Sequence, residues 1–188
     1  STPTARVLVV AVELCTLHLQ GSTEIEPLLA MLQFGDGAAA AIVTAEGSGL
    51  ELTRFFARTL PDSEGLIAWN IGDEGFIMHL AGAVPGQISA ALADQETREA
   101  IVDGETGQQW AVHAGGRSVL DAVERSLQLP GEALAHSRAV LAENGNMSSA
   151  TLLFVLARYL AWPPVDNGVA LAFGPGLAAE GFGFRSRV

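Results

Sequence analysis

The sequence contains a single cysteine, Cys15, in 188 residues. One thiol cannot close an internal disulfide, and it cannot supply the paired cysteines of a CxxC metal site. Chains without disulfides are typical of reducing compartments. We therefore predict a cytoplasmic protein and expect no metal centre in this chain.

Basic residues are also scarce. Ten Lys and Arg residues stand against 21 Asp and Glu residues, which gives a formal net charge of -11 at pH 7. Proteins that bind nucleic acids contact the phosphates with a basic surface, so we predict no nucleic-acid partner. The same deficit argues against this chain as the main binder of an anionic cofactor.

Long apolar runs are absent as well. The first apolar run, residues 7–12, ends at Glu13, whereas a membrane-spanning helix needs roughly 18–20 apolar residues. We therefore predict no membrane segment. A signal peptide needs a basic start, a longer apolar core and a cleavage site, so we expect none. The first residue is Ser1 and not Met, and we expect the chain to be part of a longer protein.

Hydrophobic residues, by contrast, are abundant. They make up 49% of the chain, and charged residues make up only 16%. This balance is typical of an α/β protein whose central elements are covered on both faces. A chain of this length can form one large domain with a substantial core. Alternatively, part of the apolar surface is an interface with a partner that this chain lacks.

The apolar patterns predict strands mixed with helices, and therefore a layered α-β-α domain. We expect a buried strand at 6–12 and, within 34–44, a glycine turn that leads into a second buried strand. Shorter extended segments are expected at 50–59, 65–71 and 75–80, a strand ending in a double-glycine turn at 108–116, and closing strands at 167–177 and 180–188. We expect helices at 84–102, 117–127, 131–144 and 148–160.

One histidine stands where a strand is expected to end. In the stretch 113–124, HAGGRSVLDAVE, two glycines and a helical pattern follow His113 closely. A histidine in this place can project into a cavity, and the glycines let another group approach closely. The alternative is that His113 only caps a turn.

Small polar residues crowd in front of the last predicted helix. The stretch 145–150, GNMSSA, precedes an apolar segment that begins at Thr151. Asn146 or Ser148 can cap that helix by accepting hydrogen bonds from its first N–H groups. A cap needs only one polar residue, however, and three are present. An asparagine amide, like a histidine, can donate a hydrogen bond to a developing oxyanion.

Two glycine-rich stretches complete the pattern. The first, FGDGAAAAIV, begins at Phe34, and the second, FGPGL, begins at Phe173. Each has a structural explanation. The first glycines set backbone geometry beside a core phenylalanine, and the second form a tight turn.

Together, HxGGxxxLDxVE, GNMSSA and GPGL, with FGDGAAA upstream, resemble the type III polyketide synthases. This is the chalcone and stilbene synthase family of thiolase-fold condensing enzymes. The resemblance runs from Arg6 to the last strand and covers the C-terminal part of such an enzyme. It implies an α/β fold with thiolase-like α-β-α layers, the C-terminal half of the duplicated fold. Residues 1–188 would form this single domain region, with residues 1–45 contributing strands that complete the N-terminal half.

The resemblance also implies a chemistry. Such enzymes use a Cys-His-Asn triad, and His113 and Asn146 match its histidine and asparagine. Acyl-CoA loads the cysteine, malonyl-CoA is decarboxylated, and the enolate attacks the thioester. Coenzyme A thioesters are substrates, and no cofactor is expected. The family is typically homodimeric, so we expect a homodimer.

The nucleophilic cysteine of the family lies before the strand that RVLVVAVE resembles, in the missing N-terminal half. Cys15 does not match it and is expected to line the acyl pocket. We therefore predict that this chain alone is inactive. Much of the basic entrance for coenzyme A is also expected from the missing part.

Further substrate-binding positions follow from the resemblance. Phe34 matches an aromatic residue between the coenzyme A tunnel and the pocket, and Met78 matches a gatekeeping position that is usually aromatic. His18 and Ser148 would line the cavity, Phe173 would lie beside the closing turn, and Trp69 would narrow the cavity. One departure is Ala114, which replaces a proline that commonly follows the catalytic histidine.

Two other functions stay open. One is a non-catalytic thiolase-fold interaction or regulatory subunit that has lost its partner half. The other keeps the fold and assigns the chain to a ketoacyl synthase III-like or hydroxymethylglutaryl-type condensing enzyme.

Overall fold

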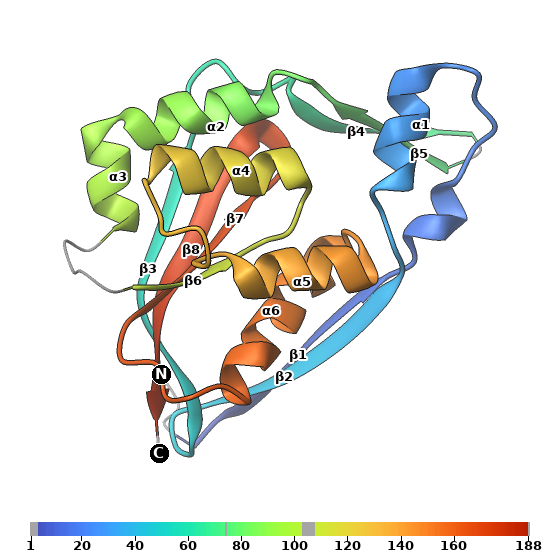
Figure 1. The fold of residues 1–188 in the computed structure, drawn as a ribbon. Coiled ribbons are helices and arrows are strands. Elements are labelled where there is room, and N and C mark those ends of the chain that lie inside the picture. Colours follow the sequence, from blue (N-terminus) through green and yellow to red (C-terminus); the bar gives the residue numbers. More distant parts are fainter. Residues whose placement is uncertain (1–3, 74, 103–107, 188) are drawn as a thin grey trace.

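A computed structural model describes residues 4–73, 75–102 and 108–187 (Figure 1). Within these ranges the helices are α1 (Ile25–Leu32), α2 (Val84–Ala93), α3 (Gln95–Ile101), α4 (Arg117–Ser126), α5 (Ala135–Asn144) and α6 (Thr151–Leu160). The strands are β1 (Arg6–Glu13), β2 (Gly37–Thr44), β3 (Gly49–Thr59), β4 (Ile67–Gly72), β5 (Gly75–Leu80), β6 (Gln109–Val112), β7 (Gly168–Phe173) and β8 (Ala178–Arg187). None of these helices combines the length and the apolar character that a bilayer crossing requires.

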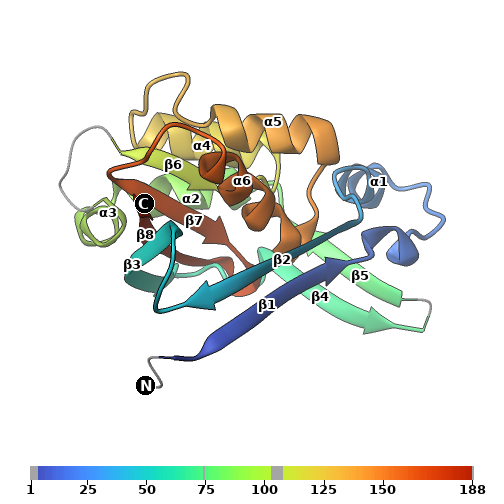
Figure 2. The same ribbon diagram turned by 90° about the horizontal axis from the view of Figure 1, so that it is seen from below.

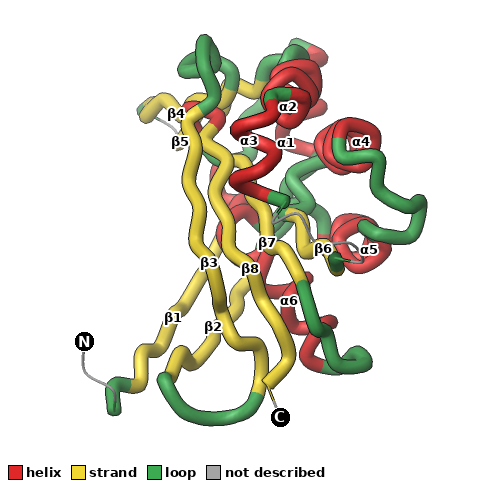
Figure 3. Tube along the Cα trace, turned by 90° about the vertical axis from the view of Figure 1, so that its left-hand side faces the viewer, coloured by secondary structure: helices red, strands yellow, loops and turns green. Residues whose placement is uncertain are grey.

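The central sheet has four strands in the order β3-β8-β7-β6. Strands β6 and β7 are parallel, and the other pairs are antiparallel. Figure 3 shows β3, β8 and β7 running alongside one another. Successive residues of β7 belong to two different hydrophobic clusters, Val169 and Leu171 to one and Ala170 to the other. Because side chains alternate between the faces of a strand, this sheet is covered on both faces.

Helices cover the two faces of that sheet. Ile88 of α2 and Leu120 of α4 are fully buried in the cluster on one face, and Val155 and Tyr159 of α6 are buried in the cluster on the other. The predicted layered α-β-α arrangement is confirmed. The parallel neighbours β6 and β7 are joined through the helices α4, α5 and α6, as a crossover connection requires.

The hairpin β1–β2 forms a sheet of its own that extends beside α6 (Figure 2). Ala11 and Ala39 are paired on the face that packs against the core. The opposite face carries Leu8 and Val10, which are 64% and 58% exposed. The two strands are present as predicted, but the prediction that they are buried was wrong for this chain, because only one face of the hairpin has a neighbour to pack against.

A second hairpin, β4–β5, lies next to α1 at the other end of the molecule (Figure 1). It carries an aromatic group in which the ring of Trp69 meets the rings of Phe34 and Phe76, each at a centroid distance of 6.1 Å. These contacts connect the hairpin to the chain that leads into β2.

Three predicted elements differ in detail. The expected helix 84–102 is two helices, because Asp94 is extended and its carboxylate accepts a hydrogen bond from Thr97 N at 2.9 Å, which starts a new helix. The helix expected from residue 148 begins as a short 3-10 turn, in which Ser148 has a φ of 47°. The glycine-rich turn after β7 is also a 3-10 turn, Pro175–Leu177.

Candidate active site

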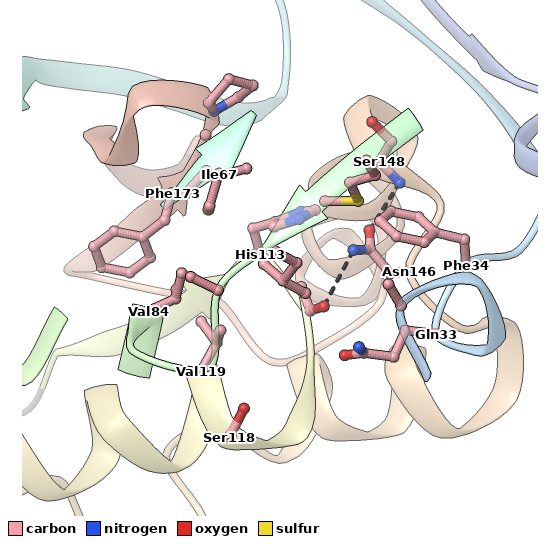
Figure 4. Close-up of a pocket in the computed structure, with 18 of the residues that line it drawn as sticks. Gln33, Phe34, Ile67, Val84, His113, Ser118, Val119, Asn146, Ser148 and Phe173 are labelled. Atoms are coloured by element: carbon pink, nitrogen blue, oxygen red, sulfur yellow. Dashed lines mark hydrogen bonds between the residues drawn. The ribbon is translucent and has the colours of Figure 1, made fainter. Parts of the chain in front are cut away.

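A cavity of about 780 Å³ opens where the β6–α4 turn, the start of α6, the β4–β5 hairpin and α1 meet (Figure 4). It combines an apolar wall with a few polar side chains. The lining residues used below are Gln33, Phe34, Trp69, Met78, His113, Gly115, Ser118, Asn146, Ser148, Ser149, Phe173 and Glu180.

His113 lies directly after β6 and faces this cavity. Its N–H donates to the carbonyl of Leu171 at 2.8 Å, and its own carbonyl accepts from Gly115 N at 2.9 Å. These bonds fix the backbone that carries the imidazole. Burial lowers the pKa of His113 to about 4, so the ring is neutral at pH 7 and carries one N–H.

The two glycines after His113 are required by close packing. A Cβ on Gly115 would lie 3.3 Å from Cδ2 of the His113 ring, and one on Gly116 would lie 2.6 Å from Oε1 of Gln33. The first glycine therefore leaves room for the imidazole. The second lets the α1–β2 connection approach the start of α4.

Asn146 lies shortly before α6, lines the cavity and is only 6% exposed. Its N–H donates to the carbonyl of Gln33, and its carbonyl accepts from Gly35 N, both at 2.9 Å. The two segments thus form a small parallel bridge centred on Phe34 and Asn146. The backbone of Asn146 is therefore held by a segment more than one hundred residues earlier in the chain.

The side chain of Asn146 has one orientation that satisfies its neighbours. Oδ1 accepts from Ser148 N at 2.9 Å and from the Thr151 hydroxyl at 3.5 Å. Nδ2 donates to the carbonyl of Gly115 at 3.1 Å, as the dashed line in Figure 4 shows. The atom that meets the N–H of Ser148 must be the amide oxygen, and the atom that meets the Gly115 carbonyl must be the amide nitrogen. These two contacts together fix the orientation of the Asn146 amide. Nδ2 carries two hydrogens, and the bond to Gly115 uses one of them.

The glycines of FGDG shape the support of this asparagine. A Cβ on Gly35 would lie 2.4 Å from the carbonyl oxygen of Asn144, and one on Gly37 would lie 2.5 Å from Sδ of Met147. The motif therefore allows close contact with the GNMSSA segment. The two glycines of the motif stand at the positions where distant parts of the chain come into contact.

Four of the predicted substrate-binding residues line the cavity together with His113 and Asn146. They are Phe34, Met78, Ser148 and Phe173. Trp69, which we expected to narrow the cavity, lines it as well. The structure thus brings these side chains together around one space, and their roles toward a substrate stay predictions.

Cys15 and His18 lie outside the residues that line this cavity. Both belong to a short 3-10 helix, Cys15–His18, between β1 and α1. Nδ1 of His18 accepts from Phe76 N at 3.3 Å, and its ring stacks on Phe76 at 4.6 Å. Burial, followed by the nearby carboxylates of Glu13 and Asp36, raises the pKa of the Cys15 thiol. Their predicted contribution to an acyl pocket stays a prediction.

The sequence pattern did not single out three residues that support the site. The Thr151 hydroxyl accepts from Met147 N at 2.8 Å and reaches Asn146, and Ser137 Oγ accepts from Val112 N at 3.0 Å just before His113. Gln33 lines the cavity and holds Asn146 through its carbonyl. Only the place of Thr151 at the start of an apolar helix signalled such a role.

The charge of the cavity wall is low. Glu180 is the only carboxylate among the lining residues, and no arginine or lysine is among them. With a neutral His113, the wall offers hydrogen-bond donors and apolar surface to a ligand, and its one formal charge is negative.

Comparison with known proteins finds one matching family and similar solved structures. The model of the family "Chalcone and stilbene synthases, C-terminal domain" matches residues 51–187. PKS-I of the brown alga Ectocarpus siliculosus is 28% identical, with a TM-score of 0.88 over 98% of this chain and 54% of that one. The C-terminal type III polyketide synthase domain of Steely1, a type I/III hybrid from Dictyostelium, is 27% identical, with a TM-score of 0.87 over 100% of this chain and 55% of that one.

The chain therefore spans about half the length of the two solved structures. The family match begins inside β3 and covers all elements that follow it, including the segments that carry His113 and Asn146. The chain belongs to the chalcone and stilbene synthase family, as its C-terminal domain.

Proposed function

We propose that this chain supplies the histidine and asparagine of a decarboxylating condensation site that acts on coenzyme A thioesters. The observation that carries the proposal is the Asn146 amide, whose Nδ2 is oriented by Ser148 N and the Gly115 carbonyl on the same cavity wall as His113. Two fixed donors on one wall suit a substrate oxygen that gains negative charge. Both solved structures compared above are polyketide synthases.

The proposed first step uses only these two residues. When the C–C bond between the malonyl carboxylate and the α-carbon breaks, CO₂ leaves and the electron pair forms an enolate whose charge lies on the thioester oxygen. The N–H of neutral His113 and the second N–H of Asn146 Nδ2 donate to that oxygen. Neither donor needs to lose its proton, and no metal takes part in the proposed step.

The second step needs a thioester on a cysteine outside this chain. The enolate carbon attacks the acyl carbon, a C–C bond forms, and the C–S bond breaks to release the thiolate. Cys15 is poorly suited to this role, because its raised pKa disfavours the thiolate and it is not among the residues that line the cavity. A thiolate placed beside His113 would favour the imidazolium and raise the pKa of that ring.

The test uses the longer protein that we expect a reading frame continuing upstream of Ser1 to encode. We expect an upstream cysteine on a predicted helix, and product formation from acyl-CoA and malonyl-CoA. Asn146→Asp replaces the donor by an acceptor of the same shape, and we expect kcat to fall about 10²- to 10³-fold. The matched control is Asn144→Asp, since Asn144 is exposed and does not line the cavity.

Two outcomes would contradict the proposal. One is a longer protein whose turnover survives Asn146→Asp or His113→Gln unchanged. The other is sustained condensation by residues 1–188 alone.

An upstream frame that begins with a start codon and contains no cysteine would instead favour the non-catalytic subunit. Assays of acyl-CoA against carrier-protein substrates separate the ketoacyl synthase alternative.

A further inference from the structure

A second cavity of about 510 Å³ adjoins the active-site cavity at the start of α4. The two share Gln33 and Ser118 among their lining residues. Gly116, Arg117 and Asp121 also line the second cavity. His113 lines the active-site cavity, and Arg117, four residues later in the chain, lines the second cavity.

Arg117 differs from the other basic residues of the chain because it lines one of the two cavities. The sequence has no lysine, so all ten basic residues are arginines. Arg117 is the only one of them among the lining residues of the two cavities. Within the described ranges, no ion pair or hydrogen bond of its side chain is found, and Arg117 is exposed.

The neighbouring charges leave this cation available. Asp121, one turn further along α4, is already paired with Arg138 at 2.7 Å, and Arg138 also contacts Glu124 at 3.0 Å. Glu180, the carboxylate of the active-site cavity, lines only that cavity and belongs to β8. The second cavity is thus the place where an anionic group meets a positive charge next to the reactive residues.

We propose that Arg117 is a specificity residue that binds a phosphate group of the coenzyme A thioester in the second cavity. This inference rests on the proposed function, because that function brings a coenzyme A thioester to His113 and Asn146. The thioester end carries less charge than the phosphates and suits the nearly uncharged cavity, whereas the phosphates at the other end of the molecule require a cation. A guanidinium suits them, since it can donate two parallel hydrogen bonds to one phosphate.

The test measures binding of coenzyme A and of pantetheine, which lacks the phosphates, to residues 1–188 by calorimetry. We expect Arg117→Gln to weaken coenzyme A binding about tenfold, the effect of one charge-assisted contact, and to leave pantetheine binding unchanged. Arg117→Lys should restore part of the affinity, because it keeps the charge without the fork. The matched control is Arg125→Gln, on the same helix but outside both cavities, and it should bind coenzyme A like the wild type.

Salt gives a second measurement. Raising the ionic strength should weaken wild-type binding of coenzyme A more than binding by Arg117→Gln, since an exposed ion pair is screened. The inference is overturned if the wild type binds no coenzyme A, if Arg117→Gln binds it like Arg125→Gln, or if pantetheine affinity falls equally. These results leave the proposed function to its own test, because that test reads turnover of the longer protein after changes at Asn146 and His113.

Discussion

His113 and Asn146 are held in the cavity wall by different means. The histidine follows a sheet strand, and its backbone is bonded to the neighbouring strand at Leu171. The asparagine belongs to no strand or helix. It is fixed instead by donating its N–H to the Gln33 carbonyl and by accepting hydrogen bonds from the N–H groups of Gly35 and Ser148. The position of the asparagine therefore depends more on single side chains and turns than the position of the histidine does.

Thr151 provides one such support. Thr151→Val keeps the shape of the side chain, but it leaves the buried N–H of Met147 without its acceptor and removes the longer of the two hydrogen bonds to Asn146 Oδ1. We expect a loss of about 1–3 kcal/mol in the free energy of unfolding, measured with urea. Thr151→Ser keeps the hydroxyl and should lose less. A Thr151→Val chain at least as stable as Thr151→Ser would show that this hydroxyl does not support the loop.

The buried imidazole of His113 should make stability depend on pH. Its pKa falls from 6.5 to about 4 on folding, so the unfolded chain binds more protons between these values. The free energy of unfolding should rise with pH through this window and lose up to about 3 kcal/mol as the pH falls from 6.5 to 4. Burial also lowers the pKa of His136, so the measured quantity is the difference between the wild type and His113→Gln. A difference independent of pH, or a histidine signal in NMR titrating near 6.5 at His113, would contradict this prediction.

At the scale of elements, the turn into β2 and the turn into α6 fit each other through glycines. Gly35→Ala would place a methyl group 2.4 Å from the Asn144 carbonyl, a backbone atom that cannot move by itself. We expect a loss of about 1–3 kcal/mol on denaturation, as for other overpacked sites. Gly21→Ala is the matched control, because no atom lies within 4 Å of the added carbon. Equal stability of the two variants would contradict the role given to this glycine.

Many of these elements could be predicted from the sequence, and the differences have physical causes. The apolar stripe of α4 has a clear helical period, because this helix packs against one cluster, and the continuous apolar run of β7 is typical of a strand covered on both faces. The split at Asp94 was missed, since a capping carboxylate inside a helical pattern resembles an ordinary polar residue until its bond to Thr97 is seen. In the site, His113 and Asn146 were predicted through motifs. Gln33 and Ser137 were not, because their contacts join residues far apart in sequence.

At the scale of the whole molecule, the β1–β2 hairpin leaves one apolar face without a neighbour. Leu8, Val10, Val12 and Ile42 are each more than half exposed, although the pattern of these strands is typical of a buried sheet. The sequence could predict that these residues prefer burial. It could not show which part of this chain would cover them, and none of the described residues does so.

This exposed face should make the chain self-associate. We expect light scattering to show a mass that rises with protein concentration, because contiguous apolar surface promotes association. The double variant Leu8→Thr and Val10→Thr keeps residues that suit a strand and should shift the chain toward the monomer. The control is Leu160→Gln, an exposed leucine at the end of α6. A wild type that stays monomeric at high concentration would contradict the prediction.

The bridge between Phe34 and Asn146 has a consequence for where this domain can be cut. The family match begins at residue 51, yet the two backbone bonds that hold Asn146 come from Gln33 and Gly35. A shorter protein that starts at residue 51 would keep every side chain proposed for catalysis and lose the clamp on one of them. The contact also joins residues far apart in sequence, and such contacts tend to form late in folding. The active site should thus be among the last parts of this domain to acquire its final geometry.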